Sequence, residues 1–110
     1  MGVDISLICP HCRQEVGDSS VYITYNISKM VEDLGVKDIL WDPQDNGIIE
    51  AEQLITPLSQ AIARLEESPN HYKTYDSPNG WGTYDSLLKA LRKLENACIQ
   101  NPKAAVSVWR

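Results

Sequence analysis

Cys9 and Cys12 stand two residues apart near the start of the 110-residue chain, with Pro10 and His11 between them. Thiolates at this spacing can hold one side of a tetrahedral zinc ion from a hairpin turn, or form a redox pair when they cap a helix. Turn residues and then a β-branched and aromatic run, 21–25, follow them, which predicts a strand rather than a helix and disfavours the redox interpretation. A structural zinc knuckle and a metal-free β-turn both stay open, and a lone Cys-x-x-Cys favours the latter.

A zinc site at this point needs more ligands than the pair supplies. The candidates are His11, His71, Cys98, or the same two cysteines of another subunit. Cys98 belongs to a helical apolar stripe and is expected to be a small buried core residue, which removes it from the set. With only three cysteines a closed disulfide framework is not possible, and a reducing compartment is the economical context.

The stretch 77–84, Ser-Pro-Asn-Gly-Trp-Gly-Thr-Tyr, is the least generic part of the chain. Its two glycines allow positive φ on either side of an indole, so the backbone can fold tightly around Trp81. We expect Trp81 to plug the end of the core, and the alternative is an indole that stacks a ring while nearby amides hold an anion. If a pocket exists, its candidate binding residues are Asn79, Gly80, Trp81, Tyr84, His71 and Tyr75.

The charge of −5 is unevenly distributed. Residues 28–55 hold two Lys against seven acids, and residues 86–110 hold five basic residues against one Glu. Lys89, Arg92 and Lys93 fall opposite the apolar stripe of their helix, so we expect a solvated face, with an anion-binding or head-to-tail patch as the alternative. The overall acidity argues against nucleic acid as the main partner.

Elements that position these residues can be read from the periodicity. Residues 3–8, 21–26 and 104–109 predict strands. Residues 29–34 and 84–98 predict helices, the second capped by Thr83, whereas 36–41 is ambiguous. The helix that ends near residue 67 is expected to start at Pro57 with Thr56 as its N-cap, because proline disrupts a helix interior.

This order of elements predicts an α+β fold with about three antiparallel strands and two or three helices packed on one face. We expect a single domain, 1–110, divided into a knuckle-bearing hairpin (1–27), a helical part (28–100) and a terminal strand (103–110). No apolar run is long enough to span a membrane. The first residues lack the pattern of a signal peptide, so a cytoplasmic location is expected.

Four stretches together resemble a family of small uncharacterised proteins from bacteria and their phages: residues 24–30, the Leu-rich helix, the Asn-Gly-Trp-Gly-Thr-Tyr segment at 79–84, and 97–108. The resemblance spans nearly the whole chain, and the Asn-Gly-Trp-Gly core is its specific part. It implies a one-domain prokaryotic or phage accessory protein and carries over no activity.

Function is therefore expected to be non-enzymatic binding, with a protein partner or self-association at the 79–84 loop. One alternative is the binding or sequestering of a small, nucleotide-like ligand by the 71–84 loop. Another is a zinc-knuckle nucleic-acid binder built on Cys9, Cys12 and the basic helix. No Ser/His/Asp or Cys/His constellation stands out, so an enzyme is not favoured and zinc is the one cofactor considered.

Overall fold

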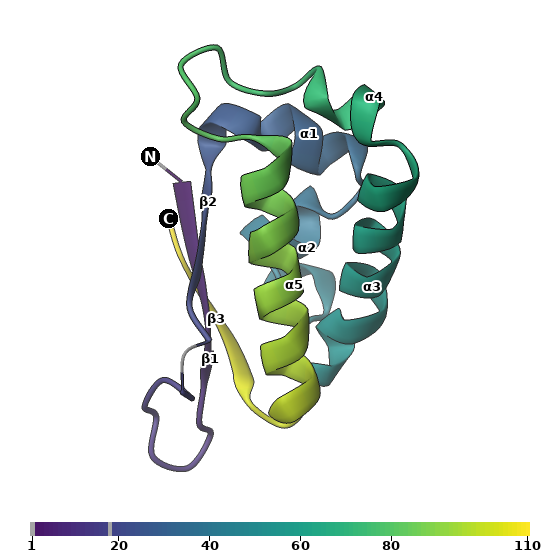
Figure 1. Cartoon of the computed structure of the whole chain (residues 1–110). Coiled ribbons are helices and arrows are strands. Elements are labelled where there is room, and N and C mark those ends of the chain that lie inside the picture. The colour runs from purple at the N-terminus through teal and green to yellow at the C-terminus, as the bar shows by residue number, and fades with distance from the viewer. Residues whose placement is uncertain (1, 18) are drawn as a thin grey trace.

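Three antiparallel strands form one sheet in the order β2-β1-β3. The computed structural model describes residues 2–17 and 19–110 (Figure 1). The first strand, β1 (Gly2–Ile8), lies in the centre, between β2 (Val21–Thr24) and the last strand, β3 (Ala105–Trp109). The first and last strands thus lie side by side in one sheet, and the three predicted strands and their antiparallel pairing are confirmed. The strand predicted over 21–26 is shorter than expected: it ends at Thr24, because residues 25–27 form a 3-10 turn.

Alternation along the strands gives the sheet one buried face. Val3, Ile5 and Leu7 of β1 are fully buried, their partners Ile23, Val21 and Val106 are buried as well, and Val108 is partly buried. Because side chains point to opposite faces in turn, Asp4 and its register partners Tyr22 and Trp109 face the other way. The sheet therefore has an inner apolar face and an outer face that carries exposed side chains.

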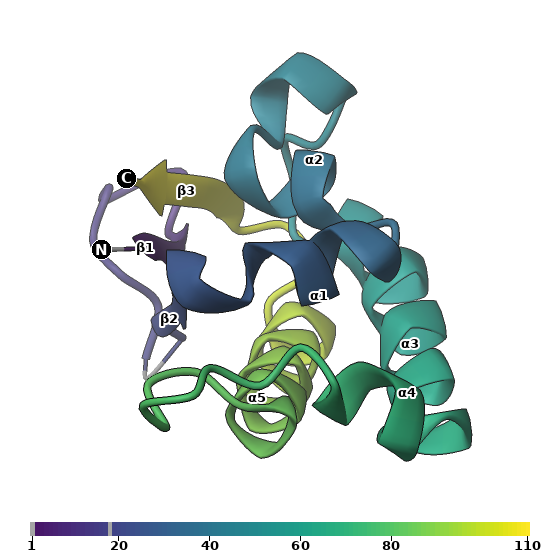
Figure 2. The same ribbon diagram turned by 90° about the horizontal axis from the view of Figure 1, so that it is seen from above.

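The helices all lie on the inner side of the sheet (Figure 2). The α+β class is confirmed, although there are five helices in the described residues rather than two or three, because 36–41 and 69–73 each form one short helix. The helical elements are α1 (Ser28–Asp33), α2 (Lys37–Trp41), α3 (Glu52–Glu67), α4 (Pro69–Lys73) and α5 (Tyr84–Gln100), with 3-10 turns η1 (Tyr25–Ile27) and η2 (Gln44–Asn46).

The longest helix, α5, packs its apolar stripe between the sheet and α3. Leu87, Leu91, Leu94 and Cys98 in this stripe are fully buried, as the periodicity predicts. Thr83 caps the helix: its side chain accepts a hydrogen bond from the Ser86 amide, and the Ser86 hydroxyl accepts one from the Thr83 amide. The predicted N-cap is confirmed.

The start of α3 differs from the prediction. The helix begins at Glu52, so Pro57 lies inside it and Thr56 is not its N-cap. Two amides before the proline are bonded to the segment that leads into β3, Ala51 N to Ala104 O and Glu52 N to Pro102 O, both at 2.9 Å. These long-range bonds, together with burial of Leu54, hold the first turns in place despite the donor that proline lacks.

No helix in the described part of the chain is both long enough and apolar enough to cross a bilayer.

Tyr84, one of the candidate binding residues, is buried and joins α5 to α3. Its hydroxyl donates a 2.6 Å hydrogen bond to the carbonyl oxygen of Leu65. In a longer helix that carbonyl would accept from the residue four positions on, but this is Pro69, which has no amide hydrogen. The tyrosine hydroxyl thus satisfies a buried carbonyl at the end of α3.

We predict that Tyr84→Phe lowers the free energy of unfolding by about 1–2 kcal/mol, because the Leu65 carbonyl loses its partner in a buried position. Urea unfolding followed by circular dichroism measures the change. The matched control is Tyr22→Phe at an exposed ring, with an expected change within about 0.5 kcal/mol. Equal effects of the two substitutions would contradict the assignment.

Candidate functional site

The segment that carries Trp81, residues 76–83 and here named the Trp81 loop, is fixed at its backbone. Asn26 Nδ2 of η1 donates to the carbonyl oxygen of Trp81 at 2.9 Å. The Trp81 amide donates to Asn79 Oδ1, also at 2.9 Å, and the Ser77 amide donates to the carbonyl of Gly82. Three hydrogen bonds therefore hold the indole-bearing residue in one place, and the Asn79 side chain, predicted only as a candidate binding residue, takes part by accepting from the Trp81 amide.

Gly82 lies close against the end of β2 and against η1. Its φ of 117° lies in the region that favours glycine, and an added Cβ would stand 2.6 Å from Thr24 Cγ2 and 3.0 Å from Ile27 Cγ2. A larger residue there would force the Thr24 and Ile27 side chains to shift and would also strain the backbone at this φ. Sequence reasoning proposed glycine for backbone freedom, and the structure adds close packing as a second reason.

The prediction that Trp81 plugs the end of the core is wrong. Its side chain is 75% exposed, whereas Tyr84 is buried beneath the loop. The Trp81 carbonyl accepts from Asn26 of η1, and the Trp81 amide donates to Asn79 of the loop. With the backbone held in this way, the chain turns at Gly82 and Tyr84 enters the core. The indole is left outside.

A hollow of about 430 Å³ lies beside the indole, here named the Trp81 hollow. Edge strand β2, η1 and the first turns of α5 form its walls, and its lining is mostly apolar. Tyr22, 53% exposed, lies at this hollow with Trp81. The lining includes Tyr22, Ile23, Asn26, Ile27, Trp81 and Leu87.

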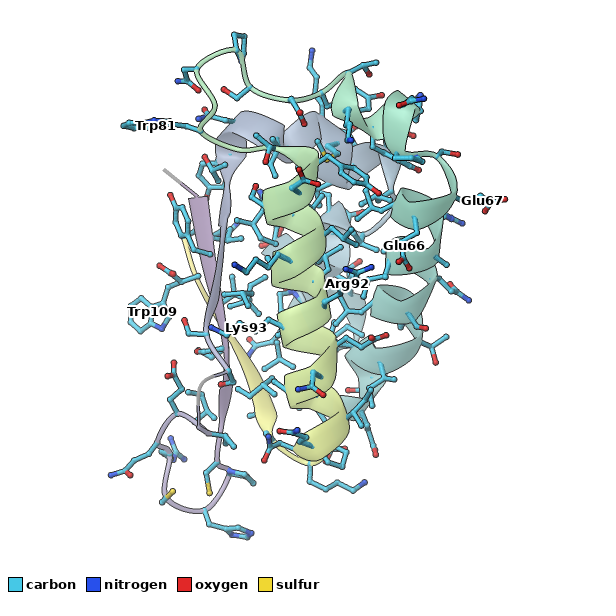
Figure 3. All side chains as sticks on the ribbon, viewed as in Figure 1. Glu66, Glu67, Trp81, Arg92, Lys93 and Trp109 are labelled. Atoms are coloured by element: carbon cyan, nitrogen blue, oxygen red, sulfur yellow. The ribbon has the colours of Figure 1, made fainter. Side chains whose placement is uncertain are left out.

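Exposed aromatic rings continue from the hollow across the outer face of the sheet. Asp4 stands opposite Tyr22 on one side and Trp109 on the other, and Trp109 is 73% exposed. Figure 3 shows the indoles of Trp81 and Trp109 projecting on the side away from the helices. The sequence analysis did not identify Tyr22 and Asn26 as site residues, although the strand predicted over 21–26 contains both.

His71 and Tyr75 do not lie at the Trp81 hollow. Both contact Asp33 of α1: the Tyr75 hydroxyl donates to Asp33 Oδ2, and His71 Nε2 lies 2.7 Å from the same oxygen. The hydrogen bond from Tyr75, and secondly that from His71, lowers the pKa of Asp33. The same bond raises the pKa of Tyr75. This cluster joins α4 and its following turn to α1, and no local signal links Asp33 to partners 38 and 42 residues away.

The loop at residues 9–14, here named the knuckle, is a closed turn. Cys9 N donates to Gln14 O at 2.8 Å and Arg13 N to Cys9 O at 2.9 Å, while Arg13 takes the left-handed φ of 61°. The Cys12 amide donates to Cys9 Sγ at 3.5 Å. Hydrogen bonds from Cys12, first through its backbone, lower the pKa of the Cys9 thiol.

Cys98 cannot complete a metal site with this pair. It is fully buried, and desolvation raises the pKa of its thiol to about 11, so the core assignment is confirmed. Within residues 2–17 and 19–110, no three His, Cys, Asp or Glu side chains gather closely enough to hold a metal ion. His11 and His71 therefore do not join Cys9 and Cys12, and the knuckle supplies two thiols only.

The basic face of α5 is partly engaged within the chain. Arg92 forms an ion pair with Glu66 of α3, and Lys93 Nζ donates to the carbonyl of Ser20 at 2.8 Å. Figure 3 shows these side chains lying between neighbouring elements. Part of the charge that could attract an anionic partner is thus used in packing α5 against its neighbours.

Comparisons with protein-family models, curated proteins and solved structures found no match for this chain.

We predict that Gly82→Ala lowers the free energy of unfolding by at least about 2 kcal/mol, because the new methyl group meets Thr24 and Ile27 and the φ is strained. Gly80→Ala is the matched control. Gly80 also has a positive φ, 75°, but a methyl group added there would meet no atom within 4 Å. A loss of about 1 kcal/mol is expected there. Thermal unfolding of both variants measures the difference, and equal losses would show that close packing at Gly82 is unimportant.

A second prediction concerns the dependence of stability on pH. Because the folded-state pKa of Asp33 is below its ordinary 3.8, the Asp33 contacts stabilise fully above that pH and are lost as the pH falls through the lowered value. Asp33→Asn should therefore flatten the decline in stability between about pH 5 and pH 2. Urea midpoints measured across this range give the comparison, and parallel curves for the two proteins would contradict it.

Proposed function

We propose that this chain is a non-enzymatic binding protein whose contact surface is centred on Trp81, Tyr22 and the Trp81 hollow, and that its partner is another protein. The observation that carries the proposal is the combination of a fixed backbone and an exposed indole at Trp81. The resemblance to small bacterial and phage proteins leads us to propose, in addition, that the protein has an accessory role in the cytoplasm of such cells.

An exposed indole on a fixed backbone is a preorganised anchor for association. Trp and Tyr are enriched among the residues that dominate binding energy, with contributions of about 2 kcal/mol or more each. Such rings lose little conformational entropy on binding, and less still where the backbone does not have to be ordered. Trp81 meets both conditions, because its carbonyl and amide are already bonded to Asn26 and Asn79.

The shape of the surface favours a protein over a small molecule. Small-ligand sites enclose most of the ligand, whereas an indole that is 75% exposed covers little of one. The neighbouring outer sheet face adds Trp109 and Asp4 to the same side of the molecule. A protein segment can place an apolar side chain in the Trp81 hollow and extend across these residues.

A nucleotide-like ligand at the same hollow receives less support. An anion would need free amides at the N-terminus of α5, but the Tyr84 amide donates to Asp76 Oδ1 at 2.7 Å and the Ser86 amide to Thr83 Oγ1. The Asp76 carboxylate also repels a phosphate there. The volume of about 430 Å³ is nonetheless within the range of small-ligand sites, so we keep this class as an outcome of the test.

The test is selection of peptides from a random displayed library on the immobilised full chain, followed by titration of the enriched peptides. We predict that these peptides carry an aromatic or large aliphatic residue and that Trp81→Ala weakens their binding at least about tenfold, since removing an anchor costs about 1.4 kcal/mol or more. The melting temperature should change little because the side chain is exposed.

Ile99→Ala is the matched control, since Ile99 is also an exposed apolar residue, 55% accessible on α5, and should leave binding unchanged. Amide chemical shifts map each peptide on the surface. Peptides that shift other surfaces, or that bind both variants equally, would overturn the proposal. Nucleotides that shift the Trp81 hollow when no peptide does would favour the small-ligand class instead.

A further inference from the structure

The knuckle has the backbone of a preformed two-thiolate ligand. Its ends are closed by the Ile8–Glu15 bridge and the Val16 N to Leu7 O bond of 2.8 Å. Inside it, the Cys12 amide points at Cys9 Sγ, which is how N–H groups stabilise sulfur carrying negative charge. Arg13 adopts a left-handed φ that non-glycine residues disfavour. The surrounding hydrogen bonds therefore hold the turn in a shape that arginine would not adopt by itself.

We propose that Cys9 and Cys12 of two copies of this chain together bind one zinc ion, so that the metal joins the copies at their knuckles. Zinc in structural sites takes four ligands in a tetrahedron, and Cys-x-x-Cys pairs each supply two of them. The described part of one chain supplies no third ligand beside the pair. In this proposal the two remaining ligands are the thiolates of Cys9 and Cys12 of the second copy.

A second copy can reach this site without disturbing the fold. The knuckle extends beyond the lower end of the sheet, past the end of α5 (Figure 1). Cys12 is exposed, and a hollow of about 450 Å³ lies between the knuckle and residues 101–104. A matching loop can enter from this side, and a two-fold axis through the metal gives both copies the same contacts.

The charge around the knuckle is also suitable. Four thiolates on one zinc ion leave a net negative charge, which nearby cations and N–H groups stabilise. Arg13 directly follows Cys12 in each copy, and Lys103 lines the adjacent hollow. Glu15 lines the same hollow and Lys103 also pairs with Glu52, so Arg13 and the N–H groups of the turn are the main source of compensating positive charge in each copy.

The experiment uses the full chain, purified under reducing conditions without added zinc and then titrated with zinc. Native mass spectrometry and metal analysis should find a dimer with one zinc per two chains. A strong chelator should give metal-free monomers, and returning zinc should restore the dimer. Cobalt(II) in place of zinc should give the visible absorption of a tetrahedral site with four thiolates.

Three variants separate this site from other sources of metal or dimer. Cys12→Ser and Cys9→Ser should lose both zinc and the dimer while keeping the far-ultraviolet circular dichroism of the wild type. His11→Ala is the matched control within the same loop and should keep one zinc per two chains. Trp81→Ala should also keep it, because the Trp81 hollow lies elsewhere.

Several results would overturn the inference. One zinc per monomer that is lost in His11→Ala would assign the site to a single chain. A dimer that survives the chelator would owe nothing to metal, and a reduced wild-type protein that stays monomeric in excess zinc would leave the knuckle a metal-free turn. A Cys9–Cys12 disulfide that reforms readily after reduction, with no zinc bound by the dithiol, would return the pair to redox chemistry.

Discussion

Burial of the apolar stripe of α5 between the sheet and α3 is the interaction on which the rest of the structure depends. Leu87, Leu91 and Leu94 are fully excluded from water, and each contributes about 1.5–3 kcal/mol by area. The helices of the described residues all gather on this side of the sheet. The outer face consequently stays open, and Tyr22 and Trp109 are exposed there because none of the described helices lies over them.

The position of Trp81 follows from the same helix. Thr83 caps α5, so the residues just before it must meet the end of β2, where α5 packs against the sheet. Gly82 makes that contact with Thr24, and Asn26 bonds the carbonyl of Trp81. The geometry of the candidate site is thus a consequence of how α5 enters the core rather than a property of the loop alone.

Short-range patterns in the sequence predicted the elements whose shape is set locally. The alternation of Val21 and Ile23, the stripe that ends in Cys98 and the cap at Thr83 were all recognisable because each depends on neighbours within a few residues. Two predictions were wrong: Pro57 lies inside α3 rather than at its start, and Trp81 lies outside the core rather than plugging it. In both cases a hydrogen bond to a residue far away in the sequence decides the outcome. Ala104 accepts from the amide at the start of α3, and Asn26 donates to the Trp81 loop. A pattern of neighbouring residues cannot predict such long-range bonds.

The two proposed contact sites lie at opposite ends of the sheet, and that separation gives them a joint consequence. The knuckle follows the last residue of β1, whereas Thr24 at the Trp81 hollow pairs with Gly2 at its first. A seven-residue strand separates these ends by about 20 Å. Two copies joined at their knuckles would therefore hold their Trp81 surfaces outward at the far ends. A partner with repeated binding segments would then bind the dimer more tightly than either surface alone, because the second contact forms at a high effective concentration.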